Sequence, residues 1–135
     1  MSIRWFFTAS VISVSFIVAG FIGAFVADAF QLWYEPVIGF FAAFAVVLST
    51  YLSAPHHKLT SAIAAFFVGA VLAWILLKDS FYPSSYGEEL AYTSTYLPLV
   101  VTYLGGTLGC LTAALINWWV GPNNSFKPTP LRGAA

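Results

Sequence analysis

Apolar residues occupy four long stretches of the chain, and no charged side chain interrupts any of them. The stretches run over residues 5–27, 36–54, 59–77 and 96–120. At about 1.5 Å of rise per residue, a helix of roughly 20 residues crosses the roughly 30 Å hydrocarbon core of a bilayer. Backbone amides in lipid must pair within the segment, and the alternating pattern of a barrel strand is absent. The pattern therefore predicts an all-α, polytopic membrane protein with four transmembrane helices in a compact bundle.

Proline and aromatic residues mark the borders of these stretches. Pro36 and Pro98 fall in the first turn of the second and fourth predicted helices, where a missing amide hydrogen costs nothing, and Pro55 ends the second. Amphipathic rings favour the headgroup level of a membrane. Those near the borders are Trp5, Trp33, Tyr34, Trp74, Tyr82, Tyr96, Trp118 and Trp119. Both signals predict the same helix ends.

Composition supports a membrane class, because 60 % of the 135 residues are hydrophobic and only 7 % are charged. So few polar side chains cannot coat a water-soluble globule of this size. The net charge of zero gives no indication of a nucleic-acid partner. We expect one transmembrane domain over residues 1–121 and a disordered cytoplasmic tail over 122–135, where prolines and asparagines replace the apolar pattern.

The few charged residues are sorted between the two sides of the predicted membrane. The acids all follow the first or third stretch: Asp28, Glu35, Asp79, Glu88 and Glu89. Most bases precede the first stretch or follow the second or fourth: Arg4, Lys58, Lys127 and Arg132, with Lys78 as the exception. Loops that carry lysine and arginine stay in the cytoplasm. The charge sorting thus predicts a multi-pass membrane protein with both termini cytoplasmic and an acidic outer segment over residues 78–95.

A second interpretation makes the first stretch a cleaved signal peptide. Arg4 supplies a minimal basic start, and Ala27-Asp28-Ala29 resembles a small-residue cleavage site. The stretch of 23 uncharged residues is much longer than a signal core of roughly 7 to 15 residues. We therefore favour four spans, and three spans would keep the same orientation.

Small residues recur every fourth position in three of the stretches, which places them on one face of a helix. Such faces let helix backbones approach closely in a membrane. The predicted packing residues are Ser15, Ala19, Gly23 and Ala27 in the first helix, Ser61, Ala65, Gly69 and Ala73 in the third, and Gly105, Gly109, Ala113 and Asn117 in the fourth. Packing within the chain is the simpler interpretation, and a homodimer face is the alternative.

No residue set has the spacing of a catalytic, cofactor-binding or metal site, so we expect neither an enzyme nor a cofactor. Asp28 and Glu35 flank an outer turn where water can solvate both, and the lone Cys110 is expected to pack as a small apolar residue. The cytoplasmic group His56, His57 and Lys58 could contact lipid headgroups weakly. Glu88 and Glu89 could contact a partner or divalent cations, although a solvated acidic loop is the ordinary explanation.

The segment from Ser125 to Ala135, Ser-Phe-Lys-Pro-Thr-Pro-Leu-Arg-Gly-Ala-Ala, resembles the endings of proteins encoded on bacterial integron gene cassettes. The resemblance implies a bacterial, mobile gene and a tail that reflects DNA sequence, and therefore that the membrane is the bacterial inner (plasma) membrane. In size and span number the chain is also similar to the small multidrug resistance transporters and to the small fluoride channels. The first of these families depends on a glutamate within its first helix, and residues 5–27 contain no acid. Neither family is assigned.

Two functions follow as hypotheses. The first is a non-catalytic accessory protein of the lipid bilayer that recognises a second copy or another membrane protein through its small-residue faces or its Tyr-rich outer segment. The second is an oligomeric transporter or channel for ions or small molecules, lined by the polar residues of the fourth helix: Thr102, Thr107, Thr112 and Asn117.

Overall fold

The structure is a computed structural model that describes residues 3–121. Within these residues lie four long helices, α1 (Ile3–Ala29), α2 (Tyr34–Ser53), α3 (Lys58–Leu77) and α4 (Leu97–Val120), and one short 3-10 helix, η1 (Ser84–Tyr86). Each long helix has the length and apolar composition needed to cross a membrane. The prediction of an all-α, multi-pass membrane protein is confirmed. The predicted tail, residues 122–135, lies outside the described residues.

The helix ends lie within two residues of the borders of the apolar stretches. At the α1–α2 turn, Asp28 belongs to the last turn of α1 and Glu35 to the first turn of α2. A carboxylate near a helix N-terminus interacts favourably with the helix dipole, so α2 can begin at Tyr34 while the side chain of Glu35 stays at the headgroup level. Ala54 ends α2 in an extended conformation, immediately before Pro55.

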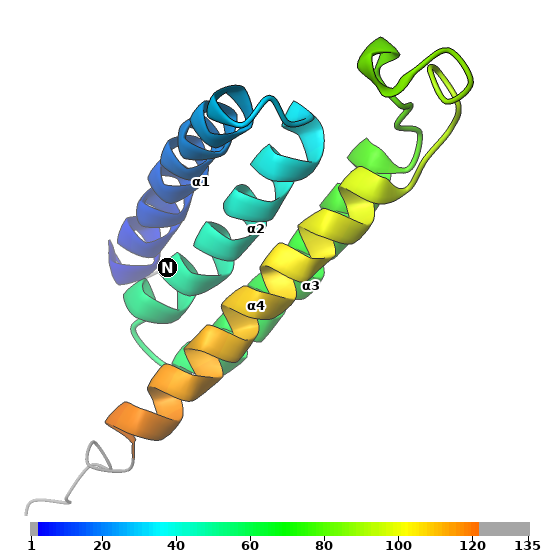
Figure 1. The fold of residues 1–135 in the computed structure, drawn as a ribbon. Helices are drawn as coiled ribbons and strands as arrows, with labels where there is room; N and C mark the ends of the chain where they lie inside the picture. The colour runs from blue at the N-terminus through cyan, green and yellow to red at the C-terminus, as the bar shows by residue number, and fades with distance from the viewer. Residues whose placement is uncertain (1–2, 122–135) are drawn as a thin grey trace, which may run out of the picture.

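Helix α2 is the centre of the bundle, because it packs against α1, α3 and α4. Helices α3 and α4 also pack against each other, whereas α1 makes a substantial helix contact only with α2 among the described residues. Figure 1 shows the result: α1 on one side, α2 in the middle, and the pair α3 and α4 on the other side. One face of α1 therefore meets protein, and the rest of its circumference is left for lipid.

Glycines set the distance between α2 and its two main neighbours. A Cβ atom added at Gly23 of α1 would lie 2.9 Å from the Cα of Ile38 in α2. On the opposite side, a Cβ at Gly109 of α4 would lie 3.0 Å from the Cβ of Val47. Both helices thus approach α2 at a distance that most side chains would prevent.

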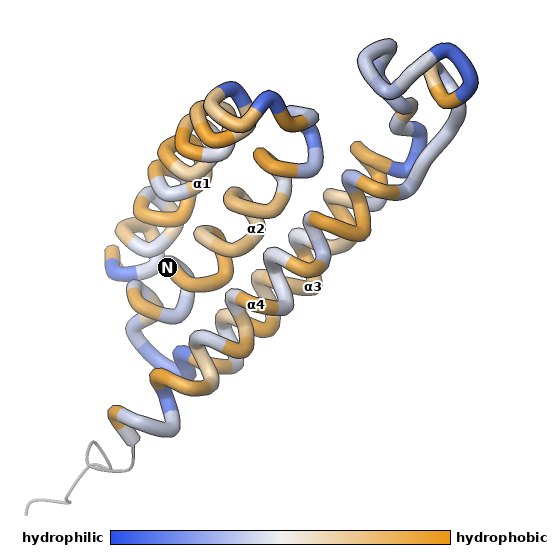
Figure 2. The backbone as a smooth tube through the Cα atoms, in the orientation of Figure 1, coloured by the Kyte–Doolittle hydropathy of each residue, from blue (hydrophilic) through white to orange (hydrophobic). Residues whose placement is uncertain are grey.

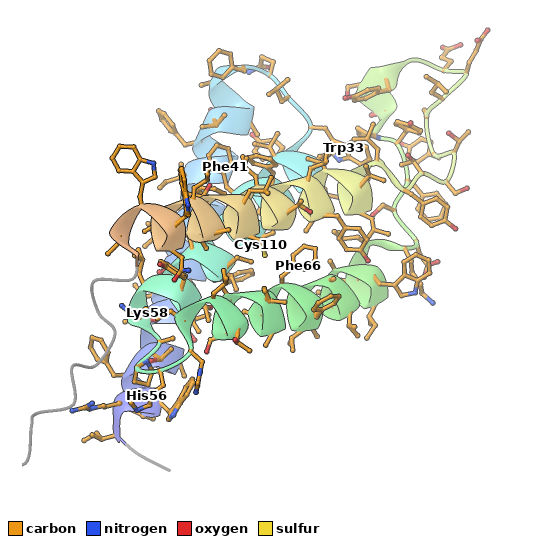
Figure 3. The ribbon with its side chains drawn as sticks, turned by 90° about the horizontal axis from the view of Figure 1, so that it is seen from below. Trp33, Phe41, His56, Lys58, Phe66 and Cys110 are labelled. Atoms are coloured by element: carbon orange, nitrogen blue, oxygen red, sulfur yellow. The ribbon has the colours of Figure 1, made fainter. Side chains whose placement is uncertain are left out.

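The core of buried side chains lies among α2, α3 and α4. Val47 and Tyr51 of α2 meet Ala62 of α3 and Ala113 of α4, and Phe66 and Cys110 pack against this cluster. Figure 3 shows Phe66 and Cys110 between α3 and α4. Cys110 is thus a packing residue in the structure.

The two ends of the bundle carry different charges. The carboxylates of residues 3–121 all lie at the end formed by the α1–α2 turn and the segment between α3 and α4, which we call the acidic end. Arg4 and Lys58 lie at the opposite, basic end, where α1 begins and α2 turns into α3. Figure 2 shows polar segments at both ends and apolar helices between them, and Figure 3 places Trp33 far from His56 and Lys58. A membrane lying across the helices would separate the two charges.

Candidate functional site

The predicted small-residue faces of α1 and α4 lie mostly against α2. In α1, Ala19, Gly23 and Ala27 are buried and Ser15 is half-buried. In α4, Gly105, Gly109 and Ala113 are buried, whereas Asn117 is exposed. The Gly105–Gly109 pair contacts the backbones of Phe40 and Phe44 in α2. These faces are therefore filled within the chain, and a second copy could not use them without displacing α2.

The packing face of α3 is turned by about one residue from the predicted one. Ala73 is buried, but Ser61 and Ala65 are only half-buried, and a Cβ added at Gly69 would meet nothing within 4 Å. Their neighbours Ala62 and Phe66 face the core instead. The reason is Gly106 of α4, which leaves room for the Phe66 ring, so that a large side chain of α3 fits opposite a small one. Spacing of small residues alone could not reveal this pairing.

The polar residues of α4 do not line a common path. Thr102, Thr107 and Thr112 each donate a hydroxyl hydrogen bond to the carbonyl four residues earlier, at 2.7, 2.8 and 2.8 Å. A spacing of five residues turns each successive side chain by about 140° around the helix. Thr102 contacts Gly39 of α2, and Asn117 is exposed. The set predicted for a channel is thus spread around α4, with its hydroxyl hydrogens already bonded.

The remaining predicted groups lie on the surface at the two ends. The Tyr34 hydroxyl donates to a carboxylate oxygen of Asp28 at 3.0 Å, and Glu35 is exposed beside them. His56 and His57 are exposed at the basic end. Within the part of the chain that the structure describes, no three His, Cys, Asp or Glu residues lie where they could hold a metal ion together.

The segment between α3 and α4 is a folded hairpin, which we call the acidic hairpin (residues 78–96). The Thr95 amide donates to the Ser80 carbonyl at 2.9 Å, and the Tyr82 amide donates to the Thr93 carbonyl at 3.0 Å. Next along the hairpin, the Tyr92 amide donates to the Tyr82 carbonyl at 2.9 Å. Figure 1 shows this hairpin projecting beyond the ends of α3 and α4. Its backbone is therefore held by paired hydrogen bonds.

An aromatic cluster ties the acidic hairpin to the other turn at the same end. The ring centroid of Trp33, from the α1–α2 turn, lies 5.7 Å from the ring centroid of Tyr82 and 5.9 Å from the ring centroid of Tyr86. The ring centroids of Tyr82 and Tyr86 are 5.6 Å apart. Such offset and edge contacts contribute about 0.5–1.5 kcal/mol per pair beyond area burial. The aromatic pattern predicts Trp33 and Tyr82 at the headgroup level but does not predict their contact, since they are far apart in the chain.

The outer surface of the acidic hairpin combines exposed apolar rings with carboxylates. Tyr92 has a φ of 62°, in the left-handed region that bulky side chains rarely adopt, and its side chain is 75 % exposed. Leu90 is also exposed, and the exposed acids Glu88 and Glu89 precede it. This surface brings an exposed ring, an exposed aliphatic side chain and two carboxylates together outside the apolar spans. We therefore take it as the candidate functional site.

Comparison of the chain with protein-family models, with curated proteins and with solved structures finds no match.

Proposed function

We propose that this chain is a non-catalytic accessory protein of a bacterial inner membrane, and that it recognises another membrane protein through the acidic hairpin. The observation that carries the proposal is Tyr92, whose backbone is held at a φ of 62° while its ring stays 75 % exposed. A left-handed conformation costs a non-glycine residue roughly 1–2 kcal/mol. Glycine at this position would remove that cost.

Because the Tyr92 side chain is 75 % exposed, its packing within the chain offsets little of this backbone cost. Strained backbone positions concentrate at binding and switch sites, where a side chain must be presented in a particular direction. Tyrosine is also enriched at the centres of protein interfaces, since it buries a large area at a small cost in conformational entropy. Both facts favour a role for the Tyr92 side chain in contacting a partner.

The neighbours of Tyr92 indicate the chemistry of the partner. Glu88 and Glu89 are exposed beside Leu90, so a complementary surface would offer an apolar pocket bordered by lysine or arginine. The aromatic contacts of Trp33 hold the hairpin before any partner arrives. Preorganisation of this kind lowers the entropy lost on binding.

The charge sorting supports the proposed orientation, with both termini cytoplasmic and the acidic hairpin on the outside. Arg4 and Lys58 lie at the basic end, and the short turn that leads into Lys58 is of the kind retained in the cytoplasm. The cassette-like ending of the sequence favours a bacterial source. The partner would then present its basic surface at the outer face of the same membrane.

Site-specific photo-crosslinking tests the proposal. A photoreactive amino acid in place of Leu90 should give one adduct of defined mass with a second membrane protein in intact cells. Addition of Tyr92→Gly should abolish the adduct although it removes backbone strain. The matched control is His57→Gly, which relieves a similar positive φ of 48° at the basic end and should leave the adduct unchanged.

Two results would contradict the proposal. One is that the photoreactive residue in place of Leu90 yields no protein adduct at any expression level. The other is an adduct that persists in Tyr92→Gly at the level seen in His57→Gly. A probe in place of Val71, on the exposed outer face of α3, measures the background from random encounters in the lipid.

Transport through an oligomer is the alternative, and the geometry favours it less. The threonines of α4 point in different directions and bond to their own helix. A liposome flux assay on a variant with Asp28, Glu35, Glu88 and Glu89 replaced by neutral amides would test whether outer carboxylates attract a transported cation.

A further inference from the structure

A shallow, open cleft lies at the basic end, between the first turn of α1 and the end of α2. It is lined by Ile3, Arg4, Phe7, Ser53 and Pro55, and its volume is about 460 Å³. Ile3 and Phe7 supply apolar walls that are themselves exposed, and Arg4 is the cationic side chain among them. This site lies at the opposite end of the bundle from the acidic hairpin and is independent of the proposed function.

A hydrogen bond between helices holds the inner edge of this cleft in place. The Thr8 hydroxyl, only 2 % exposed, donates to the Ser53 carbonyl of α2 at 2.9 Å, and the Arg4 carbonyl lies 3.1 Å from the same hydroxyl oxygen. The backbones on both sides of the cleft therefore meet at one buried group. The backbone of Arg4 is thus held next to the end of α2, and its side chain extends from there to the exposed surface.

The charge of the cleft is positive and is not neutralised by the described chain. Among residues 3–121 the one ion pair joins Lys78 and Asp79, at the acidic end. Lys58 lies at the same end as Arg4, and the carboxylates of the described chain lie across the membrane from it. A guanidinium presents a planar fork of N–H donors that matches the oxygens of a phosphate.

We infer that this cleft binds an anionic phospholipid, with its phosphate on Arg4 and the start of its acyl chain against Ile3 and Phe7. The cleft lies where a transmembrane helix reaches the bilayer surface, which is the depth of a phosphodiester group. A zwitterionic lipid carries its own cation beside the phosphate and gains less from a second one. An anionic lipid gains the full attraction, and the apolar walls suit its chain.

Native mass spectrometry of the full chain tests this inference, with phosphatidylglycerol and phosphatidylcholine of identical acyl chains as competing probes. We expect the protein to retain phosphatidylglycerol over phosphatidylcholine by roughly five-fold, the factor that corresponds to about 1 kcal/mol per cationic residue near a membrane surface. Arg4→Gln should reduce this ratio to near one. Arg4→Lys should retain part of it, because the charge remains while the planar fork is lost.

Two controls separate the cleft from general surface charge. Lys78→Gln removes a base at the acidic end and should leave the ratio unchanged. Phe7→Ala removes an apolar wall and should weaken retention of both lipids while their ratio stays above one. Circular dichroism of each variant verifies that the helices are intact. An unchanged lipid ratio in folded Arg4→Gln, or an equal fall in Lys78→Gln, would overturn the inference.

Discussion

Gly105 of α4 lies directly against the backbone of Phe40 in α2, with no room for a side-chain atom between them. A Cβ added at Gly105 would overlap the Phe40 carbonyl oxygen and would lie 2.9 Å from the Phe40 Cα. Since α2 and α4 share one of the two largest helix contacts in the described chain, this approach determines how closely the two halves of the bundle pack.

Gly105→Ala should therefore destabilise the protein, by about 1–3 kcal/mol, because a methyl group in a filled contact forces the helices apart. The matched control is Gly69→Ala in α3, where an added Cβ meets nothing within 4 Å. That control should be neutral or up to about 1 kcal/mol stabilising, from the better helix propensity of alanine. Reversible unfolding in mixed micelles measures both, and equal values for the two variants would contradict the prediction.

Thr8→Val should weaken the contact between α1 and α2. The substitution removes the hydrogen bond to Ser53 while keeping the shape of the side chain, and such bonds in membranes contribute on average about 0.6 kcal/mol and at most about 1.7. Ser13→Ala is the control, since its hydroxyl bonds to Ala9 on an exposed face of the same helix. The same unfolding measurement should separate the two variants. A smaller effect for Thr8→Val than for Ser13→Ala would show that the hydrogen bond is not stabilising.

Trp33→Ala should loosen the acidic hairpin and leave the helices unchanged. The ring contacts of Tyr82 and Tyr86 with Trp33 link the hairpin to the α1–α2 turn, so their loss should speed hydrogen exchange at the Tyr82 and Tyr92 amides. Trp118→Ala, at an exposed position near the end of α4, is the control and should not change exchange in the hairpin. Unaltered hairpin protection in Trp33→Ala would mean that the backbone hydrogen bonds alone hold this segment.

The proposed orientation predicts opposite labelling of two new thiols. Cys110 is the single cysteine of the chain, so Cys110→Ala gives a background without thiols. On that background Glu88→Cys should react with a membrane-impermeant maleimide in intact cells, and His57→Cys should react only after the cells are broken. The reverse pattern would place the acidic hairpin in the cytoplasm.

The number and type of the helices could be predicted from sequence because a bilayer imposes a strong length requirement. Residues 36–54 need no partner to be recognised as a span, since the hydrocarbon core alone determines both their composition and their length. Helix ends differ from the predicted borders by at most two residues, and where they extend beyond a border, polar groups such as Glu35 join a helix at the headgroup level.

The contacts between helices were predicted less well because each depends on two sequence-distant residues. The spacing of Gly105 and Gly109 indicates a close contact, but the partner helix α2 follows only from the structure. The Phe66–Gly106 pair was missed because a large residue opposite a small one breaks the pattern of small residues. The strain at Tyr92 had no local signal, since nothing in the sequence distinguishes its φ from that of Tyr96.

The central place of α2 implies an uneven tolerance to mutation along the chain. Helix α1 packs substantially against one other helix in the described structure, and α2 packs against three. Lipid chains rearrange around whatever apolar side chain they meet, whereas a neighbouring helix cannot. Random apolar substitutions should therefore accumulate freely on the outer faces of α1 and α3, and natural variants of this protein should diverge there first and along α2 last.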